Sequence, residues 1–495
     1  MYIVRLKIDT TKEDEYEINR RFHALSHLHN VMVKHGKALM TRLRQNKEYQ
    51  HLKEQYRKLS QAGKKKEASK IGKQMNTIRE NIGLTKSGFE SYLKICGARF
   101  KNMLSSQQVQ KEADRVWEGA EKVLFGDGRE LHFKKFSDFH TIGGKSNTNG
   151  AKFDINTGRV EWNKMNLSCI IPDTPYISSA LNGKVSYCEI ERKAFPNGWH
   201  YYLIVYIDGE APKTIQNAGT NVSGIDMGVS SVAVVSDDRV VLQELAPKCN
   251  DYNKKIADIL QRMDASRRDS NPQNYNPDGT VKKGKKTWKK SNTYKKLEFR
   301  LRYLYRVKSE YTRQSHCHLC NELLKDSNKF IIEPMNFKAL AKRSKKTERQ
   351  DKVSDVKQKD GTVKKIHKFK RKKRYGKTVT DKSPGLFVDI LTRKCEQNNG
   401  SVTEVNNATY KASQYRHDTD EFVKVPLSQR SKEIEGRYVQ RDLYSAFLLS
   451  NPDIKFEKAE REVCIYEFKK FADMQDKKIA DMRANNVSMK QCFGF

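Results

Sequence analysis

The chain changes its pattern of hydrophobic and polar positions three times along its length. Residues 1–10 alternate polar and apolar positions, with Val4, Leu6 and Ile8 on one side, which predicts a strand. Residues 11–125 contain no proline and little glycine, and their apolar positions recur at helical spacing. We therefore expect a first strand followed by a bundle of helices.

The pattern changes again over residues 126–218. Short alternating runs are separated by Gly, Asn and Pro, and Gly198 opens a clear strand from Trp199 to Ile207. We expect a small β-barrel here. Because the strand at residues 1–10 comes before the helices, we expect it to belong to the same barrel, so that the helices form an insertion.

After residue 218 the pattern becomes mixed α/β. Residues 222–235 are strongly apolar and β-branched, with a break at Gly228, which predicts two strands. We then expect a long helix Tyr294–Leu324, a strand Lys329–Ile332, a helix opened by Ser383 as N-cap and Pro384, a strand Ser401–Val405 and a helix from Arg441. These elements predict one α/β domain over residues 219–450 and a helical tail at residues 451–495.

Charge is the feature of the composition that most narrows the possible classes of function. The chain carries 96 Lys plus Arg against 60 Asp plus Glu, a formal net charge of +36. A compact fold with this much like charge repels itself unless a polyanion accompanies it, and nucleic acid is the usual one. The densest charge lies in residues 343–382, which we expect to be a basic, mobile loop inserted in this domain. Its candidates for binding nucleic acid are Lys368, Lys370, Arg371, Lys372, Lys373 and Arg374.

Two further features predict a cytoplasmic protein that is not bound to a membrane. No apolar run approaches the roughly 20 residues that a helix needs to cross a bilayer, and the first residues alternate instead of forming a signal peptide. The nine cysteines are scattered and odd in number, which argues against the disulfide framework of a secreted protein.

Three acidic residues occupy positions that a ribonuclease-H-like fold would bring together. Asp226 lies inside an apolar strand, Glu333 ends a second strand and Asp442 opens a helix. A carboxylate within an apolar strand must be paired or bind a cation. Three carboxylates supply the oxygen ligands that Mg²⁺ or Mn²⁺ prefers. Two such ions, roughly 3.5 to 4 Å apart, could clamp the attacking water and the leaving oxygen of a phosphodiester.

Two other nucleotide- or DNA-processing folds contain related motifs. The actin-like ATPase fold also begins with a strand aspartate beside glycine, but it needs further glycine-rich phosphate loops, which we do not find. A DDE transposase has the order Asp, Asp, Glu, whereas the order here is Asp, Glu, Asp, as in RuvC nucleases. We therefore predict a RuvC-type site in which Asp226, Glu333 and Asp442 are the catalytic residues and metal ligands.

Several short motifs also resemble a known family. Gly224-Ile-Asp-Met-Gly228, Ile332-Glu-Pro-Met-Asn336 and Arg441-Asp-Leu-Tyr-Ser-Ala446 resemble the three RuvC motifs of TnpB, the insertion-sequence nuclease, and of the miniature type V CRISPR effectors. Phe133-Lys-Lys-Phe136 and Gly198-Trp-His-Tyr201 are similar to family segments in the same order. The resemblance covers nearly the whole chain and fades in the first hundred residues and in the tail.

The resemblance implies the fold class of a multidomain α+β protein. In such a protein a helical recognition bundle would be inserted in a wedge β-barrel and followed by a RuvC nuclease domain. The resemblance also implies a bacterial RNA-guided DNA endonuclease whose partners are a guide RNA, target double-stranded DNA and the displaced single strand. Arg441 would meet a phosphate. TnpB and CRISPR members share these motifs, so the origin of the guide stays open, as does the oligomeric state.

In one region the sequence departs from this family. Most members carry a four-cysteine zinc ribbon before the last acidic motif, whereas residues 411–440 contain no cysteine. Because four soft ligands cannot be assembled there, we predict no zinc and a zinc-free lid. We interpret His417 and Asp418 as parts of a structural loop. Cys317 and Cys320 lie on a predicted helix without a second cysteine pair, so we interpret them as ordinary helix residues.

Two alternative functions stay open at this point. One is an RNA-guided DNA-binding transcriptional regulator that does not cut; such a protein would be expected to lose a carboxylate, and all three are present. The other is a guide-independent RuvC-like nuclease, such as a junction resolvase, which would not need the helical block and the barrel. RNA that co-purifies with the protein would separate the second alternative from the guided nuclease.

Overall fold

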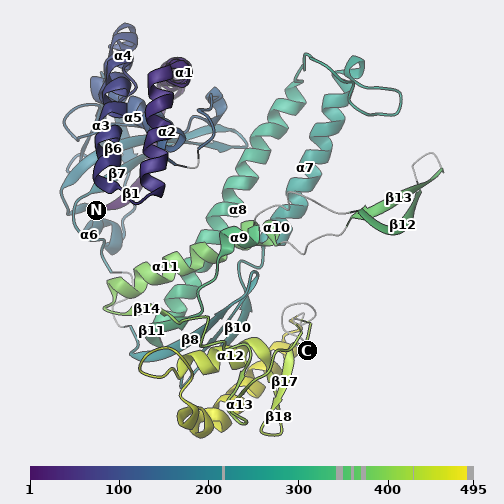
Figure 1. The fold of residues 1–495 in the computed structure, drawn as a ribbon. Helices are drawn as coiled ribbons and strands as arrows, with labels where there is room; N and C mark the ends of the chain where they lie inside the picture. Colours follow the sequence, from purple (N-terminus) through teal and green to yellow (C-terminus); the bar gives the residue numbers. More distant parts are fainter. Residues whose placement is uncertain are drawn as a thin grey trace. The chain divides into compact units, whose positions relative to one another are not determined.

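The computed structural model divides the chain into two compact units, Met1–Pro212 and Lys213–Phe495. Each is described by itself, and their elements carry the labels of Figure 1. No helix among the described residues is long and apolar enough to span a membrane. The structure describes residues 1–126, 128–213, 218–341, 349–357, 362–369, 375–426 and 428–487.

The first unit contains the expected bundle of helices. Thr11 and Asp14 form a capping box at the start of α1, in which the Asp14 N–H donates to Thr11 Oγ1 and the Thr11 N–H to the Asp14 carboxylate. Asn46 separates α1 from α2 and accepts a hydrogen bond from the Tyr49 N–H at 2.7 Å. The helices are α1 (Lys12–Gln45), α2 (Lys47–Gln61), α3 (Lys65–Asn81), α4 (Lys86–Gly97) and α5 (Ser106–Phe125).

The strands of this unit form one seven-stranded sheet in the order β2-β6-β7-β1-β5-β4-β3. β1 lies between β7 and β5, antiparallel to both. The helices α1 to α5 are therefore an insertion between strands of one sheet, as the order of the elements predicts. The strands are β1 (Tyr2–Asp9), β2 (Thr141–Gly143), β3 (Ala151–Asp154), β4 (Arg159–Trp162), β5 (Met165–Ile170), β6 (Val185–Phe195) and β7 (Gly198–Ile207), with α6 (Pro175–Leu181) between β5 and β6.

The prediction of a closed barrel is wrong, because the hydrogen-bonded order of this sheet is open and ends at β2 and β3. The Asn147 side chain occupies the gap next to β3. Its Nδ2 donates to the Phe153 carbonyl oxygen at 3.1 Å, and its Oδ1 accepts from the Phe153 N–H at 2.9 Å and lies 3.6 Å from the Cys188 Sγ of β6. Because this side chain takes the backbone groups of Phe153, β3 cannot form a strand ladder there.

The second unit is built on a five-stranded mixed sheet in the order β10-β9-β8-β11-β14. β8, β9 and β10 are antiparallel neighbours, whereas β8, β11 and β14 are parallel. The mixed α/β pattern of the sequence is thus present, and the expected strands lie close to their predicted places. The strands are β8 (Asn221–Met227), β9 (Ser231–Val235), β10 (Val240–Glu244), β11 (Ser327–Ile332) and β14 (Ser401–Glu404).

Helices cover both faces of this sheet (Figure 1). Apolar residues of α8 and α11 pack with Ile225 and Ile332 on one face, and those of α12 and α13 pack with Ala233 and Ile331 on the other. α7 and α8 form a long antiparallel hairpin. The helices are α7 (Cys249–Asp269), α8 (Asn292–Leu324), α9 (Phe337–Ala341), α10 (Gly376–Lys382), α11 (Pro384–Gln397), α12 (Arg441–Ser450) and α13 (Arg461–Ala484).

Two expectations for this unit need correction. The region expected to be a loop contains an antiparallel hairpin of β12 (Arg349–Lys357) and β13 (Val363–Phe369) as well as α10. Its alternating Val and Ile positions between charged residues are a strand signal that the charge density obscured. Ser383 precedes α11 as expected, but it has φ 47° and its Oγ donates to the Thr380 carbonyl oxygen, so it does not cap α11.

Candidate active site

The register of the second unit's sheet brings two of the predicted acidic residues side by side. β8 and β11 are parallel, and Ile225 is paired with Ile332. Asp226 and Glu333 each follow directly after one of these paired residues, so their backbones lie about one strand spacing, ~4.8 Å, apart. Since Ile225 and Ile332 face α8 and α11, alternation turns Asp226 and Glu333 toward the face that α12 covers.

A glycine explains how α12 adds the third carboxylate. A Cβ on Gly224 of β8 would lie 2.0 Å from the Ala446 carbonyl oxygen and 2.3 Å from the Ser450 backbone nitrogen. The backbone of α12 therefore packs directly on β8, an approach that any side chain at this position would block. Asp442 lies in the first turn of this helix, and its charge acts on Asp226.

The three carboxylates form one electrostatic group. Burial, followed by the charges of Asp442 and Glu333, raises the pKa of Asp226 well above its ordinary value. Burial also raises the pKa of Glu333, although the Ala412 N–H opposes this rise by donating to Glu333 Oε1 at 2.9 Å. A carboxyl group that is buried beside two others favours its protonated form until a cation balances the charge.

Two arginines supply positive charge next to these carboxylates. Arg430 Nη1 lies 3.6 Å from Asp442 Oδ2, and Arg441 Nε lies 3.8 Å from Asp442 Oδ1. Both guanidinium charges oppose the rise of the Asp226 pKa. The Nε of Arg441 is buried and makes no hydrogen bond with the part of the chain that the structure describes. An unpaired buried donor costs free energy, so a phosphate oxygen at this position would gain a hydrogen bond.

Two short hairpins stand where a lid over the carboxylates was expected. Lys432, on the second hairpin, is 5% exposed, and its Nζ donates to the Ser413 carbonyl oxygen at 2.8 Å. Burial and the charges of Arg441 and Arg416 lower the pKa of Lys432 to about 8, against the charge of Asp226. This lysine therefore belongs to the charged group around the carboxylates. The hairpins consist of β15 (Tyr415–Arg416) with β16 (Glu421–Phe422) and of β17 (Ser431–Ile434) with β18 (Arg437–Gln440).

The second hairpin leads directly into α12 through Gln440. The Gln440 side chain caps α12 by accepting from the Leu443 N–H, and its Nε2 donates to Asp442 Oδ2 at 3.2 Å. Gln475 of α13 accepts from the Gln440 N–H at 2.7 Å and donates to the Tyr438 carbonyl oxygen at 3.3 Å. Gln440 and Gln475 are both fully buried. The position of Asp442 is thus held by the hairpin and by the C-terminal helix together.

The donor atoms suit a hard divalent cation, but they do not form a ready ligand cluster. Carboxylate oxygens are the ligands that Mg²⁺ prefers, and all three motif residues carry carboxylates. Within the described part of the chain, no three His, Cys, Asp or Glu side chains are grouped so that they could hold a metal ion. The side chains of Asp226, Glu333 and Asp442 would therefore have to reorient to bind one together.

The other predicted nucleic-acid contacts lie mostly outside the described residues. Lys368 is part of β13. Lys370, Arg371, Lys372, Lys373 and Arg374 fall outside the described residues. Their role stays a prediction.

His417 and the Cys317–Cys320 segment take part in packing. His417 is fully buried, lies against Phe468 with a ring separation of 4.9 Å, and has the Tyr444 hydroxyl 2.7 Å from its Nδ1. Burial lowers its pKa. Cys320 is buried on α8 within the apolar contact to α11. These contacts match the interpretation of both segments as structural.

Sequence reasoning did not single out Arg430, Lys432 or Gln440. One signal was present: two alternating runs flank Glu435-Gly436, and both of these residues have positive φ, 48° and 72°. A two-residue turn of this kind joins the strands of a tight hairpin. The hairpin was therefore predictable from the sequence, whereas its position beside Asp226 was not.

No protein-family model matches the chain, and no curated protein sequence matches it. The solved structures that align with it over most of its length include two complexes. A Cas12f1–sgRNA–target DNA complex aligns with a TM-score of 0.45 and 13% identity, covering 91% of this chain and 98% of that one. A CRISPR-Cas12f ternary complex aligns with a TM-score of 0.26 and 11% identity, covering 92% and 100%. Both TM-scores are below 0.5, a level at which overall likeness does not establish a shared fold.

Proposed function

We propose that this protein is an RNA-guided DNA endonuclease of the kind formed by TnpB and the miniature type V CRISPR effectors, with its active site at Asp226, Glu333 and Asp442. The observation that carries the proposal is the geometry of the three motif elements: β8 and β11 pair in register at Ile225 and Ile332, and the backbone of α12 packs on Gly224. Glu333 and Asp442 accordingly act on the half-buried Asp226. The sequence resemblance supplies the reaction class, and the net charge of +36 supplies the polyanionic partners.

Divalent cations, Mg²⁺ or Mn²⁺, would be held by these three carboxylates. When bound, two such ions act as Lewis acids on a phosphodiester and make water a better nucleophile. The protein's own part is to orient the ligands. The Ala412 N–H holds Glu333, and the Gln440 side chain holds Asp442.

Arg441 and Arg430 would bind the phosphate that is to be cut. Both lie within 4 Å of Asp442 and act electrostatically on Asp226. A guanidinium group offers several donors in one plane, which suits the oxygens of a phosphate. Their charge would also offset the charge of a phosphate that enters among three carboxylates.

The guide RNA would read the DNA sequence by base pairing, and the protein would hold the RNA–DNA duplex through its backbone. The nuclease unit offers one further basic surface for this purpose, the loop that joins α7 to α8. Six lysines lie between residues 282 and 290 of this loop. Its fold is fixed by the buried Asn271, which donates to the Lys289 carbonyl oxygen at 2.9 Å and accepts from the Lys289 N–H at 2.7 Å.

The test is to express the full chain with its native flanking locus, purify it, sequence any bound RNA and incubate the complex with matching plasmid DNA and Mg²⁺. We expect a defined bound RNA and cleavage that depends on the matching sequence. Asp226→Asn should abolish cleavage and keep the RNA. Asp473→Asn is the matched control, because Asp473 is an exposed carboxylate of α13 that pairs with Arg437, and it should cleave like the wild type.

Two results would contradict the proposal in different ways. Bound RNA with DNA binding but without cleavage would indicate a guided regulator. Cleavage by a protein that carries no RNA would indicate a guide-independent nuclease.

A further inference from the structure

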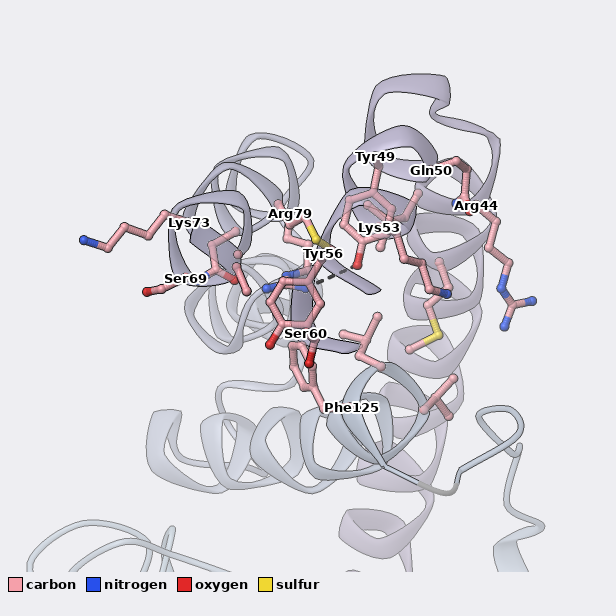
Figure 2. Close-up of a pocket in the computed structure, with 18 of the residues that line it drawn as sticks. Arg44, Tyr49, Gln50, Lys53, Tyr56, Ser60, Ser69, Lys73, Arg79 and Phe125 are labelled. Atoms are coloured by element: carbon pink, nitrogen blue, oxygen red, sulfur yellow. Dashed lines mark hydrogen bonds between the residues drawn. The ribbon is translucent and has the colours of Figure 1, made fainter. Parts of the chain in front are cut away.

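The first unit contains a groove that the proposed nuclease chemistry does not use. It lies between α2 and α3 and is closed at its base by the ends of α1 and α5 (Figure 2), with a volume of about 930 Å³. Its floor is apolar, formed by Met40, Leu43, Met75 and Leu124. Sites for small organic groups have volumes of roughly 300 to 1,000 Å³. The groove is therefore large enough for a nucleotide or two and too small for a duplex.

The charge of the groove is of one sign. Arg44, Lys53, Lys65, Lys73 and Arg79 line it, and no carboxylate does among the residues that the structure describes. Figure 2 shows Arg44 and Lys73 extending outward on its two sides. Cations gathered without counter-charges repel each other, and an anion between them would relieve the repulsion.

Aromatic rings occupy the middle of the same groove. Tyr56 is 42% exposed and Phe125 is 60% exposed, although both are large apolar rings. Arg79 lies over the Phe125 ring at 4.7 Å and donates to the Tyr49 hydroxyl at 3.3 Å, so these side chains are already placed by each other. Exposed rings beside cations are the usual platform for unstacked bases, since every base has a π-face.

Neutral polar side chains complete the lining. Gln50, Ser60, Ser69 and Asn76 add hydrogen-bond donors and acceptors to the groove. Such groups can pair with base edges and with a ribose 2′-hydroxyl, and proteins read RNA sequence in unpaired segments whose bases are splayed out. This combination favours single-stranded RNA over a DNA backbone.

We propose that this groove binds an unpaired nucleotide of RNA, with its base against Tyr56 and its flanking phosphates at Lys53 and Lys73. The identity of the RNA as the guide rests on the proposed function. Binding of unpaired RNA in the groove does not rest on it, because neither the carboxylates nor the second unit takes part.

The test uses the full-length protein freed of nucleic acid at high salt and a labelled 12-nucleotide single-stranded RNA of mixed sequence. We expect Tyr56→Ala to weaken binding about tenfold, the size of a lost base stack, and Tyr56→Phe to keep it. Lys73→Ala should weaken binding and make the log–log salt slope shallower by about 0.7, as one phosphate contact is lost.

Matched controls come from the same helices. Lys70 is exposed on α3 but does not line the groove, so Lys70→Ala should bind more like the wild type than Lys73→Ala does. Photocross-linking of RNA that contains 4-thiouridine, followed by mass spectrometry, should identify peptides with Tyr56 or Phe125. Circular dichroism must show the wild-type helix content for each variant.

Either of two results would overturn the inference. One is that Tyr56→Ala binds RNA with the affinity of the wild type, and the other is that the cross-links lie only in other segments. If the variant instead changes the oligomeric state measured by sedimentation, the groove holds a second copy of this chain. The Asp226→Asn variant keeps the two proposals apart: it should retain the cross-link to the groove, whatever the outcome of the cleavage test.

Discussion

The carboxylate of Asp226 has surroundings that differ greatly from water. It is half-buried, and desolvation together with the charges of two further carboxylates raises its pKa well above the ordinary value. In the unfolded chain the same group has a pKa near ~3.9. Between these two pKa values the folded state binds more protons than the unfolded state, so stability falls as pH rises through this window.

We predict that Asp226→Asn makes the metal-free protein more stable at neutral pH. The amide removes the repulsion and the desolvated charge, so in the presence of a chelator at pH 7.5 the melting temperature should rise, by about 2 to 4 °C for each kcal/mol gained. At about pH 4 the difference should become small, since the wild-type carboxyl is then protonated in the folded state. Scanning calorimetry at the two pH values checks this; a variant less stable than the wild type at pH 7.5 would contradict it.

A second prediction concerns Gly224, which lies at the same site. Gly224→Ala should destabilise the second unit and lower cleavage, because its Cβ would meet the backbone of α12 at 2.0 Å. Overpacking typically costs about 1 to 3 kcal/mol or more. Gly385→Ala is the control: its Cβ would meet only Phe337 Cδ2 at 3.5 Å, within helix α11. Thermal melting and cleavage rates of the two variants should therefore differ clearly, and equal effects would argue against the close approach of α12.

The hairpin β17–β18 and the helix α13 act together on the candidate site. The side chain of Gln475 bonds to the backbone of β18, and β18 leads into α12 at Arg441. α13 also contributes Phe468 and Phe471 to the core that covers one face of the sheet. The C-terminal segment is therefore part of the core of the second unit and stabilises it.

We predict that Gln475→Met lowers both stability and cleavage. Methionine has a similar length but leaves the Gln440 N–H unpaired, and a buried unpaired group costs about 1 to 3 kcal/mol. Arg437→Met is the matched change on the same hairpin. Arg437 pairs with Asp473 and Asp476 near the surface, where such pairs contribute only about 0 to 1 kcal/mol. In urea unfolding, Gln475→Met should lower the free energy of unfolding more than Arg437→Met does. The reverse order would contradict the role of Gln475 in holding β18.

The strands and helices differ in how far the sequence predicted them. The long helix was expected at Tyr294–Leu324 and lies at Asn292–Leu324, because its pattern is periodic over many turns. The basic region was expected to be a loop and contains the hairpin β12–β13. Charge dominated the interpretation of that region, although strands also tolerate charged residues at exposed positions.

The charge of the protein as a whole leads to a prediction about salt. With a net charge of +36, the full chain should lose about 10³-fold or more in affinity for unrelated duplex DNA between 50 and 200 mM NaCl, as expected when many phosphates are contacted. Fluorescence anisotropy over a salt series checks this. A nearly flat dependence would mean that the positive charge does not contact the backbone and would also weaken the proposal of a guided nuclease.

The sequence by itself determined the features that depend on residues close together in the chain: the helical bundle, the strands around Asp226 and Glu333, the helix at Asp442 and the basic charge. Local hydrogen bonding and side-chain periodicity act over a few residues, so they can be read from a single sequence. Only the tertiary structure decided what depends on distant residues. These features are the register that sets Asp226 beside Glu333, the approach of α12 to Gly224, the open edge of the seven-stranded sheet and the groove between α2 and α3. They arise from the packing of segments far apart in the chain, for which the sequence carries no local signal.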